Sequence, residues 1–294
     1  MTDTREQGST TTPATSSDAR KTWKTLEPVH AMIYFAPEAQ EEYAGVGLDL
    51  KANRALGYFP ARAAAMGPVG PGIVHATFFN FSRVACEFGL AGAWDTASPA
   101  DVLAARYRGA DRALRRMCGD ALDSPDVAEA VTLCRTACEG ATDGGRALYA
   151  AHADLPWPDA PHLQLFHAIM LLREFRGDGH IAALVAEGVS GLEAAVLHVA
   201  LGDSWSRNAL QKTRGYSSEQ WDEAVTGLVE RGWLTEDAAF TEEGSAHRQR
   251  IEDLTDTLAL PTWARIGADG CARARDLVRP LSKAIVDSGG VGVK

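Results

Sequence analysis

The 294-residue chain has few cysteines, and these five do not form a disulfide framework. Their number is odd, and the only close pair, Cys134 and Cys138, has no second pair or spaced histidines beside it. We therefore interpret the cysteines as packing or surface thiols, and we expect neither disulfides nor a metal centre built on them.

Long hydrophobic runs are also missing. No apolar stretch approaches the roughly 18 residues that a membrane-spanning helix needs. The N-terminus lacks the charged-then-apolar pattern of a signal peptide. We therefore expect a cytoplasmic protein that is not inserted in a membrane.

Three cofactor and catalytic motifs are absent from the sequence. There is no phosphate-binding loop, no dinucleotide fingerprint and no G-x-S-x-G elbow. We accordingly expect no nucleotide cofactor, no serine-hydrolase chemistry and no cofactor of another kind.

Positive charge is scarce, since the formal net charge is −10. Such a chain repels phosphate backbones unless a local basic patch overcomes the repulsion. The charge of each segment therefore decides whether nucleic acid is an expected partner.

Composition divides the chain into four parts. Residues 1–20 are polar and rich in Ser and Thr, which predicts a disordered tail. Residues 21–187 predict a helical domain, and residues 188–263 a compact module after a glycine-marked junction. Residues 264–294 predict a C-terminal helix followed by a flexible end.

The helical domain combines short, irregular helices with two well-capped ones. Pro60, Pro68 and Pro71 limit helix length near its start. Ser98 and Ser124 each precede a proline and an early acid, which predicts helix starts there. Several aromatic residues in the irregular part could line a cavity, although such a set is more often core: Tyr34, Phe35, Tyr58, Phe59, Phe78, Phe79 and Phe81.

The module at residues 188–263 begins with three predicted helices: GLEAAVLHVALG, SRNALQKTRG and SSEQWDEAVTGLVERG. A strand, a turn, a second strand and a long helix follow in WLTEDAAFTEEGSAHRQRIEDLTDTLA. This order resembles the winged helix of MarR-type regulators. The expected fold class is therefore mostly α, with an irregular multi-helix N-terminal domain and a winged-helix-like C-terminal module that contains a short β-hairpin.

Several segments together resemble an actinobacterial helix-turn-helix family: EPVHAMIYFAPEA, YFPARAAAMGPVGP, FFNF, PHLQLFHAIMLLREFRGDGH and TRGYSSEQWDEAVTGLVERGWL. The likeness covers about residues 22–265. It implies an all-helical N-terminal region followed by a winged-helix-like region. It supplies no catalytic set, so the candidate site residues rest on their chemistry.

The charge of the module argues against DNA binding. A winged helix places its third helix in the major groove, where cationic and amide side chains reach the DNA. Residues 204–263 hold eleven acidic side chains against six Lys or Arg, a net charge of −5. We therefore do not expect DNA as a partner, and the module would instead help to build a pocket or a homodimer. Six residues keep DNA binding open as an alternative: Arg207, Lys212, Arg214, Gln220, Arg248 and Arg250.

The segment from His162 to His180 is the main candidate site. Nearly every helical face from Leu163 to Phe175 is apolar, which predicts a helix packed on several sides. His167, Arg173 and Glu174 should therefore be buried. Because burying such groups costs several kcal/mol, each should have a partner.

We expect Arg173 and Glu174 to end this helix and Gly177 and Gly179 to turn the chain. His180 would then begin the next helix, close to Glu174. A carboxylate beside a histidine can orient its tautomer and raise its basicity, as general acid-base catalysis requires.

The histidine spacing does not favour a metal. His167 and Glu174 lie about 10 Å apart along a helix axis, which is too far for one ion. A metal site would need distant ligands such as His30 or His152. We therefore expect no metal.

The acid-base candidates are His167, Glu174 and His180, with His30 and Tyr34 as contributors. Ligand-binding candidates supply charge, hydrogen bonds or an aromatic surface: Arg62, Phe79, His162, Arg173, Arg176 and Asp178. A structural interpretation remains open, in which Asp178 caps a following helix, Arg173 and Glu174 form a buried ion pair, and His180 is a core residue.

The leading functional hypothesis is a protein that binds a small organic molecule. It would be a biosynthetic or tailoring enzyme of secondary metabolism, with His and Glu acid-base chemistry in a pocket between the helical domain and a winged helix that does not bind DNA. A ligand-responsive MarR-like transcription regulator is the alternative. A non-catalytic sequestration or resistance protein is a further one.

Overall fold

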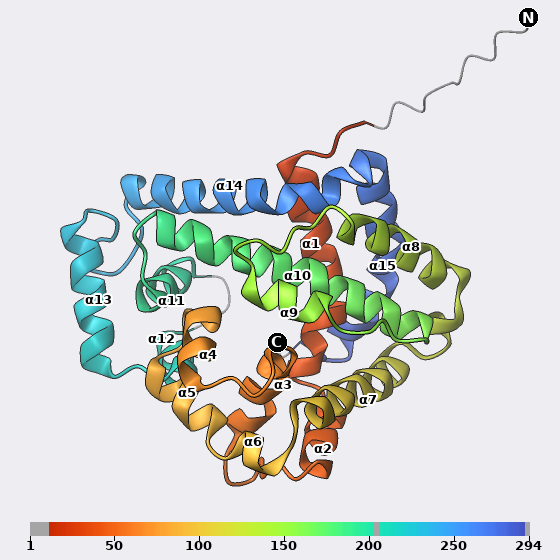
Figure 1. The fold of residues 1–294 in the computed structure, drawn as a ribbon. Coiled ribbons are helices and arrows are strands. Elements are labelled where there is room, and N and C mark those ends of the chain that lie inside the picture. Colours follow the sequence, from red (N-terminus) through yellow and green to blue (C-terminus); the bar gives the residue numbers. More distant parts are fainter. Residues whose placement is uncertain (1–11, 203–205, 292–294) are drawn as a thin grey trace, which may run out of the picture.

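The computed structural model describes residues 12–202 and 206–291, and helices dominate these ranges (Figure 1). The expected mostly α fold is confirmed. Residues 1–11 of the predicted tail and residues 292–294 of the predicted flexible end lie outside the described residues. The rest of the tail prediction is wrong, because α1 begins at Ser16. Thr15 and Asp18 form a capping box there, which satisfies backbone N–H groups at the helix start.

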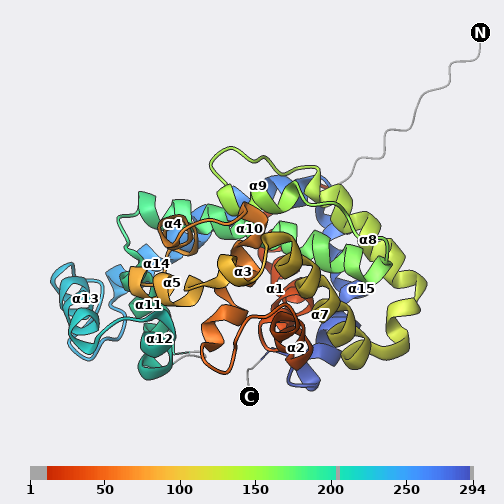
Figure 2. The same ribbon diagram turned by 60° about the horizontal axis from the view of Figure 1, so that its bottom comes forward.

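Helix α10 (Pro161–Ala186) runs through the centre of the molecule, with neighbours on several sides (Figure 1 and Figure 2). Its side chains are buried on nearly every face, which confirms the expectation of a helix packed all round. Five helices pack against it: α1 (Ser16–Ala31), α7 (Pro99–Cys118), α8 (Pro125–Cys138), α9 (Ala147–Ala153) and α14 (Glu242–Ala264).

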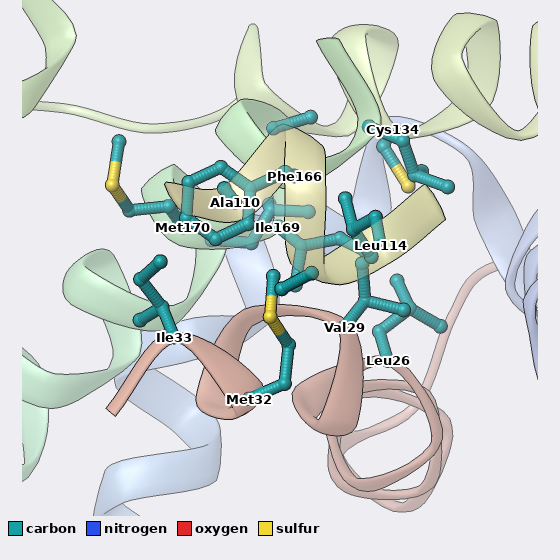
Figure 3. Packing of buried hydrophobic residues seen from close by; sticks show 14 of the residues in the cluster. Leu26, Val29, Met32, Ile33, Ala110, Leu114, Cys134, Phe166, Ile169 and Met170 are labelled. Atoms are coloured by element: carbon teal, nitrogen blue, oxygen red, sulfur yellow. The ribbon is translucent and has the colours of Figure 1, made fainter. Parts of the chain in front are cut away.

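The main hydrophobic core lies where α1, α7, α8 and α10 meet. Figure 3 shows Val29 and Leu114 from α1 and α7 facing Phe166 of α10, with Cys134 of α8 beside them. Burial of such apolar surface contributes about 25 cal/mol per Å². All five cysteines are free, as expected.

The predicted helix starts at Ser98 and Ser124 are confirmed. Ser98 Oγ accepts a hydrogen bond from the Asp101 N–H and caps α7, while Ser124 does the same for the Asp126 N–H at the start of α8. The C-terminal helix α15 (Gly267–Asp287) packs against α1 and α8. It is therefore part of the same helical body.

Short helices fill the segment between α1 and α7, as the prolines predict. Pro60 and Pro71 stand in the first turn of their helices, where a missing N–H costs nothing. The α-helices are α2 (Pro37–Gly45), α3 (Phe59–Ala63), α4 (Pro71–Phe78), α5 (Arg83–Leu90) and α6 (Ala93–Thr96). The 3-10 helices are η1 (Met32–Tyr34), η2 (Arg54–Gly57) and η3 (Ala64–Met66), and η4 (Gly119–Asp123) follows α7.

Helices α11 (Gly191–Ala200), α12 (Arg207–Arg214) and α13 (Ser218–Glu230) gather at one end of the molecule, with α13 at its outer edge in both views (Figure 1 and Figure 2). They share a second hydrophobic cluster with the end of α10 and with α14. Its buried members include Leu197, Leu210, Trp221, Leu228 and Ile251. The three helices expected in this module are confirmed.

The prediction of a β-hairpin after α13 is wrong for the described residues. A single antiparallel bridge joins Leu234 and Phe240, and a tight turn between them is closed by the Thr235 N–H bond to the Ala239 carbonyl oxygen at 2.8 Å. Thr241 already caps α14. Too little chain is therefore left for a second pair of strand residues on each side.

The expected helix end at Arg173 and Glu174 is also wrong. Helix α10 continues through Gly177 and Gly179 to Ala186. A Cβ on Gly179 would lie 2.8 Å from Arg146 Nη1 and 3.2 Å from Leu258 Cβ. This glycine therefore serves the close approach of α14 and Arg146 rather than a turn.

No single helix in the described ranges is long and apolar enough to cross a membrane. Helices α10 and α11 together have the length and composition of a membrane-spanning segment, but the pair is bent by 100°.

Candidate functional site

Glu174 is fully buried and forms the centre of an ion cluster with the buried Arg62 and the partly buried Arg173. Arg62 donates from Nη2 to Oε2 at 2.9 Å and from Nε to Oε1 at 3.3 Å, and Arg173 donates from Nη1 to Oε2 at 2.8 Å. Burial alone would raise the pKa of Glu174. The two guanidinium groups outweigh burial and hold that pKa well below its usual range. Glu174 is therefore an ionised carboxylate held by two arginines.

His180 lies on the same helix but bonds to a different group. Its Nδ1 is 2.9 Å from Thr255 Oγ1, and that hydroxyl donates its proton to the Ile251 carbonyl oxygen at 2.7 Å. Nδ1 is therefore the protonated nitrogen. Burial lowers the pKa of His180 to about 4, so the ring is neutral near pH 7. No hydrogen bond or ion pair within the described residues joins His180 to Glu174.

His30 and Tyr34 extend the polar cluster on the other side of Glu174. His30 Nε2 is 3.3 Å from both the Tyr34 hydroxyl and Arg106 Nη2. Because arginine only donates, His30 Nε2 must accept and is unprotonated. Burial lowers the pKa of His30, and its other nitrogen faces Glu27 Oε1 at 3.7 Å. The ring is therefore a neutral link in a buried network.

His162 and His167 lie near the other end of α10. His162 Nε2 bonds to Asp111 Oδ1 at 2.6 Å, and His167 Nδ1 bonds to the Tyr107 hydroxyl. The His167 ring also packs 4.6 Å from the Trp157 ring, and burial lowers its pKa to about 4. The structure thus places these two candidates apart from Glu174 and His180.

Arg176 and Asp178 have structural partners. Arg176 Nη2 bonds to Asp256 Oδ1 at 2.9 Å, and its guanidinium lies 4.4 Å from the Trp23 ring centre. Asp178 Oδ2 accepts the backbone N–H groups of Leu148 and Tyr149 at 3.0 and 2.9 Å. Asp178 therefore caps α9, which precedes it in the chain, and the expectation that it caps a following helix is wrong.

A cavity of about 240 Å³ lies between the helical body and the α11–α13 end. Arg62, Phe79, Arg173 and His180 line it, so the structure brings four of the predicted site residues together. The other predicted site residues do not line it. Tyr58, Phe78 and Phe81 add aromatic walls, and Phe78 and Phe81 belong at the same time to a buried core cluster with Phe59.

Two further arginines line the cavity from the C-terminal module. Arg214 ends α12 and Arg248 lies on α14. The sequence indicated them only as DNA-contacting candidates, because helix boundaries do not show which side of a module faces its neighbour. The half-buried Glu27 and the buried Arg106 also carried no sequence signal.

The segment from Phe79 to Ser82 connects the cavity to the module. Phe79 has φ of 53°, an unusual conformation for a residue with a side chain. A Cβ on Gly191 would lie 2.0 Å from the Phe79 carbonyl oxygen, so this segment rests directly on the start of α11. The Ser82 N–H also donates to the Arg214 carbonyl oxygen at 2.8 Å.

Helices α12 and α13 are joined by a tight turn. Gly215 has φ of 74°, and a Cβ there would lie 2.8 Å from both Ser82 Oγ and Ala85 Cβ. Ser217 then caps α13, with a capping box that includes Gln220. Two helices joined by a three- or four-residue turn that contains glycine are typical of a helix-turn-helix.

No group of three His, Cys, Asp or Glu side chains in the described residues has the arrangement of a metal site.

The chain matches a helix-turn-helix family over residues 19–292. Comparisons with curated proteins and with solved structures gave no match. The family match corrects the prediction from charge that DNA is not a partner, because the helix-turn-helix is a DNA-reading motif. Since the match spans almost the whole sequence, the chain belongs to this helix-turn-helix family.

Proposed function

We propose that the protein is a transcription regulator that binds duplex DNA through α12 and α13 and responds to a small organic molecule in the cavity. Membership of the helix-turn-helix family is the observation that carries this proposal. We take residues 188–263 as the DNA-binding module, with a MarR-like order of helices. The loop between Leu234 and Phe240 would be its reduced wing.

The position of α13 supports its use as the recognition helix. It lies at the outer edge of the molecule, with Trp221 and Leu228 turned into the module core. Gln220 uses Oε1 to accept the Ser217 N–H, which leaves its exposed Nε2 amide to donate to a base edge.

The charge of this surface limits where phosphate contacts can form. Glu219, Asp222 and Glu223 on α13 are exposed and repel phosphates. Arg207 Nη1 bonds to Asp222 Oδ1 at 2.7 Å and offsets one of these charges. Lys212 on α12 is exposed and has no ion pair in the described residues. We therefore assign the main phosphate contact to Lys212.

The position of the cavity supports a response to a ligand. Its walls come from the helical body through Tyr58 and Arg173, and from the module through Leu197, Arg214 and Arg248. A ligand there would contact both parts at once. It would therefore favour whichever arrangement of the two binds it better.

Fluorescence anisotropy with labelled duplexes from the region upstream of the protein's own gene tests DNA binding. We expect saturable binding at low salt. Lys212→Ala should weaken it on every sequence and reduce the slope of log affinity against log salt by about 1. Gln220→Ala should weaken binding to the preferred duplex more than to a scrambled one.

Lys283→Ala is the matched control, because this exposed lysine lies on α15 and pairs with Asp287. It should leave both affinity and salt slope unchanged. If Lys212→Ala and Lys283→Ala behave alike on every duplex, the helix-turn-helix surface is not the DNA-binding site. Ligand binding without any DNA binding would instead favour the sequestration hypothesis.

A further inference from the structure

We propose that the cavity binds a small aromatic carboxylate and that Arg214 recognises its carboxylate group. This names the ligand class of the proposed function, and its regulatory meaning rests on that function.

The charge balance of the cavity favours an anionic ligand. Four arginines line it, whereas no carboxylate of the described residues does. Arg62 and Arg173 share Glu174, Arg173 also lies 3.7 Å from Glu27, and Arg248 pairs with Glu252, so four arginines face three carboxylates. The cavity therefore carries an excess of guanidinium groups over the carboxylates that compensate them.

Arg214 is the arginine that lacks a carboxylate partner in the described chain. Its only side-chain hydrogen bond runs from Nη1 to the Thr213 hydroxyl at 3.3 Å. Nε is buried without a partner, and Nη2 makes no hydrogen bond. Burial lowers the pKa of Arg214, which reflects the cost of holding this cation away from water. A carboxylate in the cavity that pairs with this guanidinium would offset that cost.

The walls of the cavity select an aromatic body for this anion. The Arg214 guanidinium lies 4.3 Å from the Phe81 ring centre, which fixes its plane. Tyr58 lies 5.4 Å from Phe81 between ring centres, and Phe78 and Phe79 complete the apolar side. Aromatic rings gain from offset or edge contacts with such walls.

The size of the cavity limits the ligand to one or two rings. Its volume is about 240 Å³. This is below the range of about 300–1,000 Å³ for pockets that bind drug-sized ligands. A single planar ring system with one carboxylate is therefore the class that fits.

Arg214 also connects the ligand to the turn between α12 and α13. Its carbonyl oxygen accepts the Ser82 N–H, and the next residue, Gly215, packs against Ser82 and Ala85. A carboxylate that pulls on the Arg214 side chain would thus act at the end of α12. This gives the ligand a direct route to the proposed DNA-binding helices.

Isothermal titration of the full chain with 2-naphthoate, without DNA, tests the proposal. The neutral isostere 2-naphthamide and inorganic phosphate serve as comparison probes. We expect 2-naphthoate to bind at least ten-fold more tightly than either probe. Arg214→Gln should weaken 2-naphthoate at least ten-fold and leave 2-naphthamide unchanged. Arg279→Gln, an exposed residue of α15, should bind like the wild type.

The probe comparison in the wild type keeps the test decisive if Arg214→Gln does not fold, and Arg248→Gln then provides a second, smaller loss. Equal binding of 2-naphthoate and 2-naphthamide would overturn the proposal, as would phosphate binding as tightly as 2-naphthoate or no 2-naphthoate binding up to millimolar concentration. Because these titrations contain no DNA, their failure is distinct from a failure of DNA binding, which would leave the ligand class standing.

Discussion

Replacing Glu174 by glutamine tests whether the buried ion cluster holds the helical body together. The change keeps the shape of the side chain but removes its charge. Arg62 would then be buried without a compensating carboxylate, and Arg173, whose side chain is 23% exposed, would keep only Glu27 at 3.7 Å. Removing one partner of a buried ion pair costs about 3–5 kcal/mol, and here two cations lose the same partner.

For a chain of this size, about 3–5 kcal/mol corresponds to a fall in Tm of roughly 6–20 °C. Calorimetry of the wild type and Glu174→Gln measures this directly. Glu129→Gln is the control, because Glu129 pairs with Arg273 on the surface, with side chains 46% and 50% exposed. An exposed pair contributes about 1 kcal/mol or less, so the control should lose a few degrees at most.

The two roles considered for Glu174 predict different outcomes. If it were an acid-base residue, Glu174→Gln would keep the fold stable and abolish turnover. If it is the anion of the arginine cluster, the variant loses stability. A Glu174→Gln protein with the same Tm as the Glu129→Gln control would refute the structural role of Glu174.

The two glycines of α10 should respond oppositely to replacement by alanine. Gly179→Ala should lower Tm, because the new Cβ would meet Arg146 and Leu258. Gly177→Ala should raise Tm, because no atom lies nearer than 3.7 Å to the new Cβ and alanine favours the helix. Thermal melts decide this, and equal shifts would contradict the packing explanation. Burial raises the pKa of Asp178 to about 6, from 3.8, so the folded state favours its protonated form. The resulting stabilisation is present below about pH 4 and is lost as the pH rises through about 6. Asp178→Asn should lack this loss. Parallel curves of unfolding free energy against pH for the wild type and the variant would contradict this prediction.

Local sequence signals predicted much of the helical fold. The caps at Ser98 and Ser124, with their prolines and acids, placed the starts of α7 and α8. The nearly continuous apolar faces from Leu163 to Phe175 predicted the burial of α10. These signals act within one or two helical turns, so they do not depend on the rest of the chain.

The errors arose where a distant contact decides the structure. Gly179 reads as a turn residue, yet it lets α14 approach α10. The hairpin after α13 was expected from the strand-turn-strand pattern of the segment, but Thr241 already caps α14 and leaves no room for it.

The candidate site could be predicted only in part. Arg62, Phe79, Arg173 and His180 meet at the cavity, although three separate segments supply them. Arg214 was named only as a residue that could contact DNA, because nothing in the sequence shows that α12 packs against the Phe79–Ser82 segment. The net charge of the module argued against DNA binding. That prediction failed because a count of charges does not show where each charge lies.

Selection of binding sites from a random duplex library measures DNA recognition most directly, because it does not depend on a chosen promoter. We expect the wild type and Lys283→Ala to enrich one sequence motif. Gln220→Ala should change or lose that motif, and Lys212→Ala should weaken recovery of all duplexes. A palindromic motif would add a homodimer to the account. Recovery of no motif by the wild type at low salt, with only sequence-independent binding, would contradict the proposed regulator.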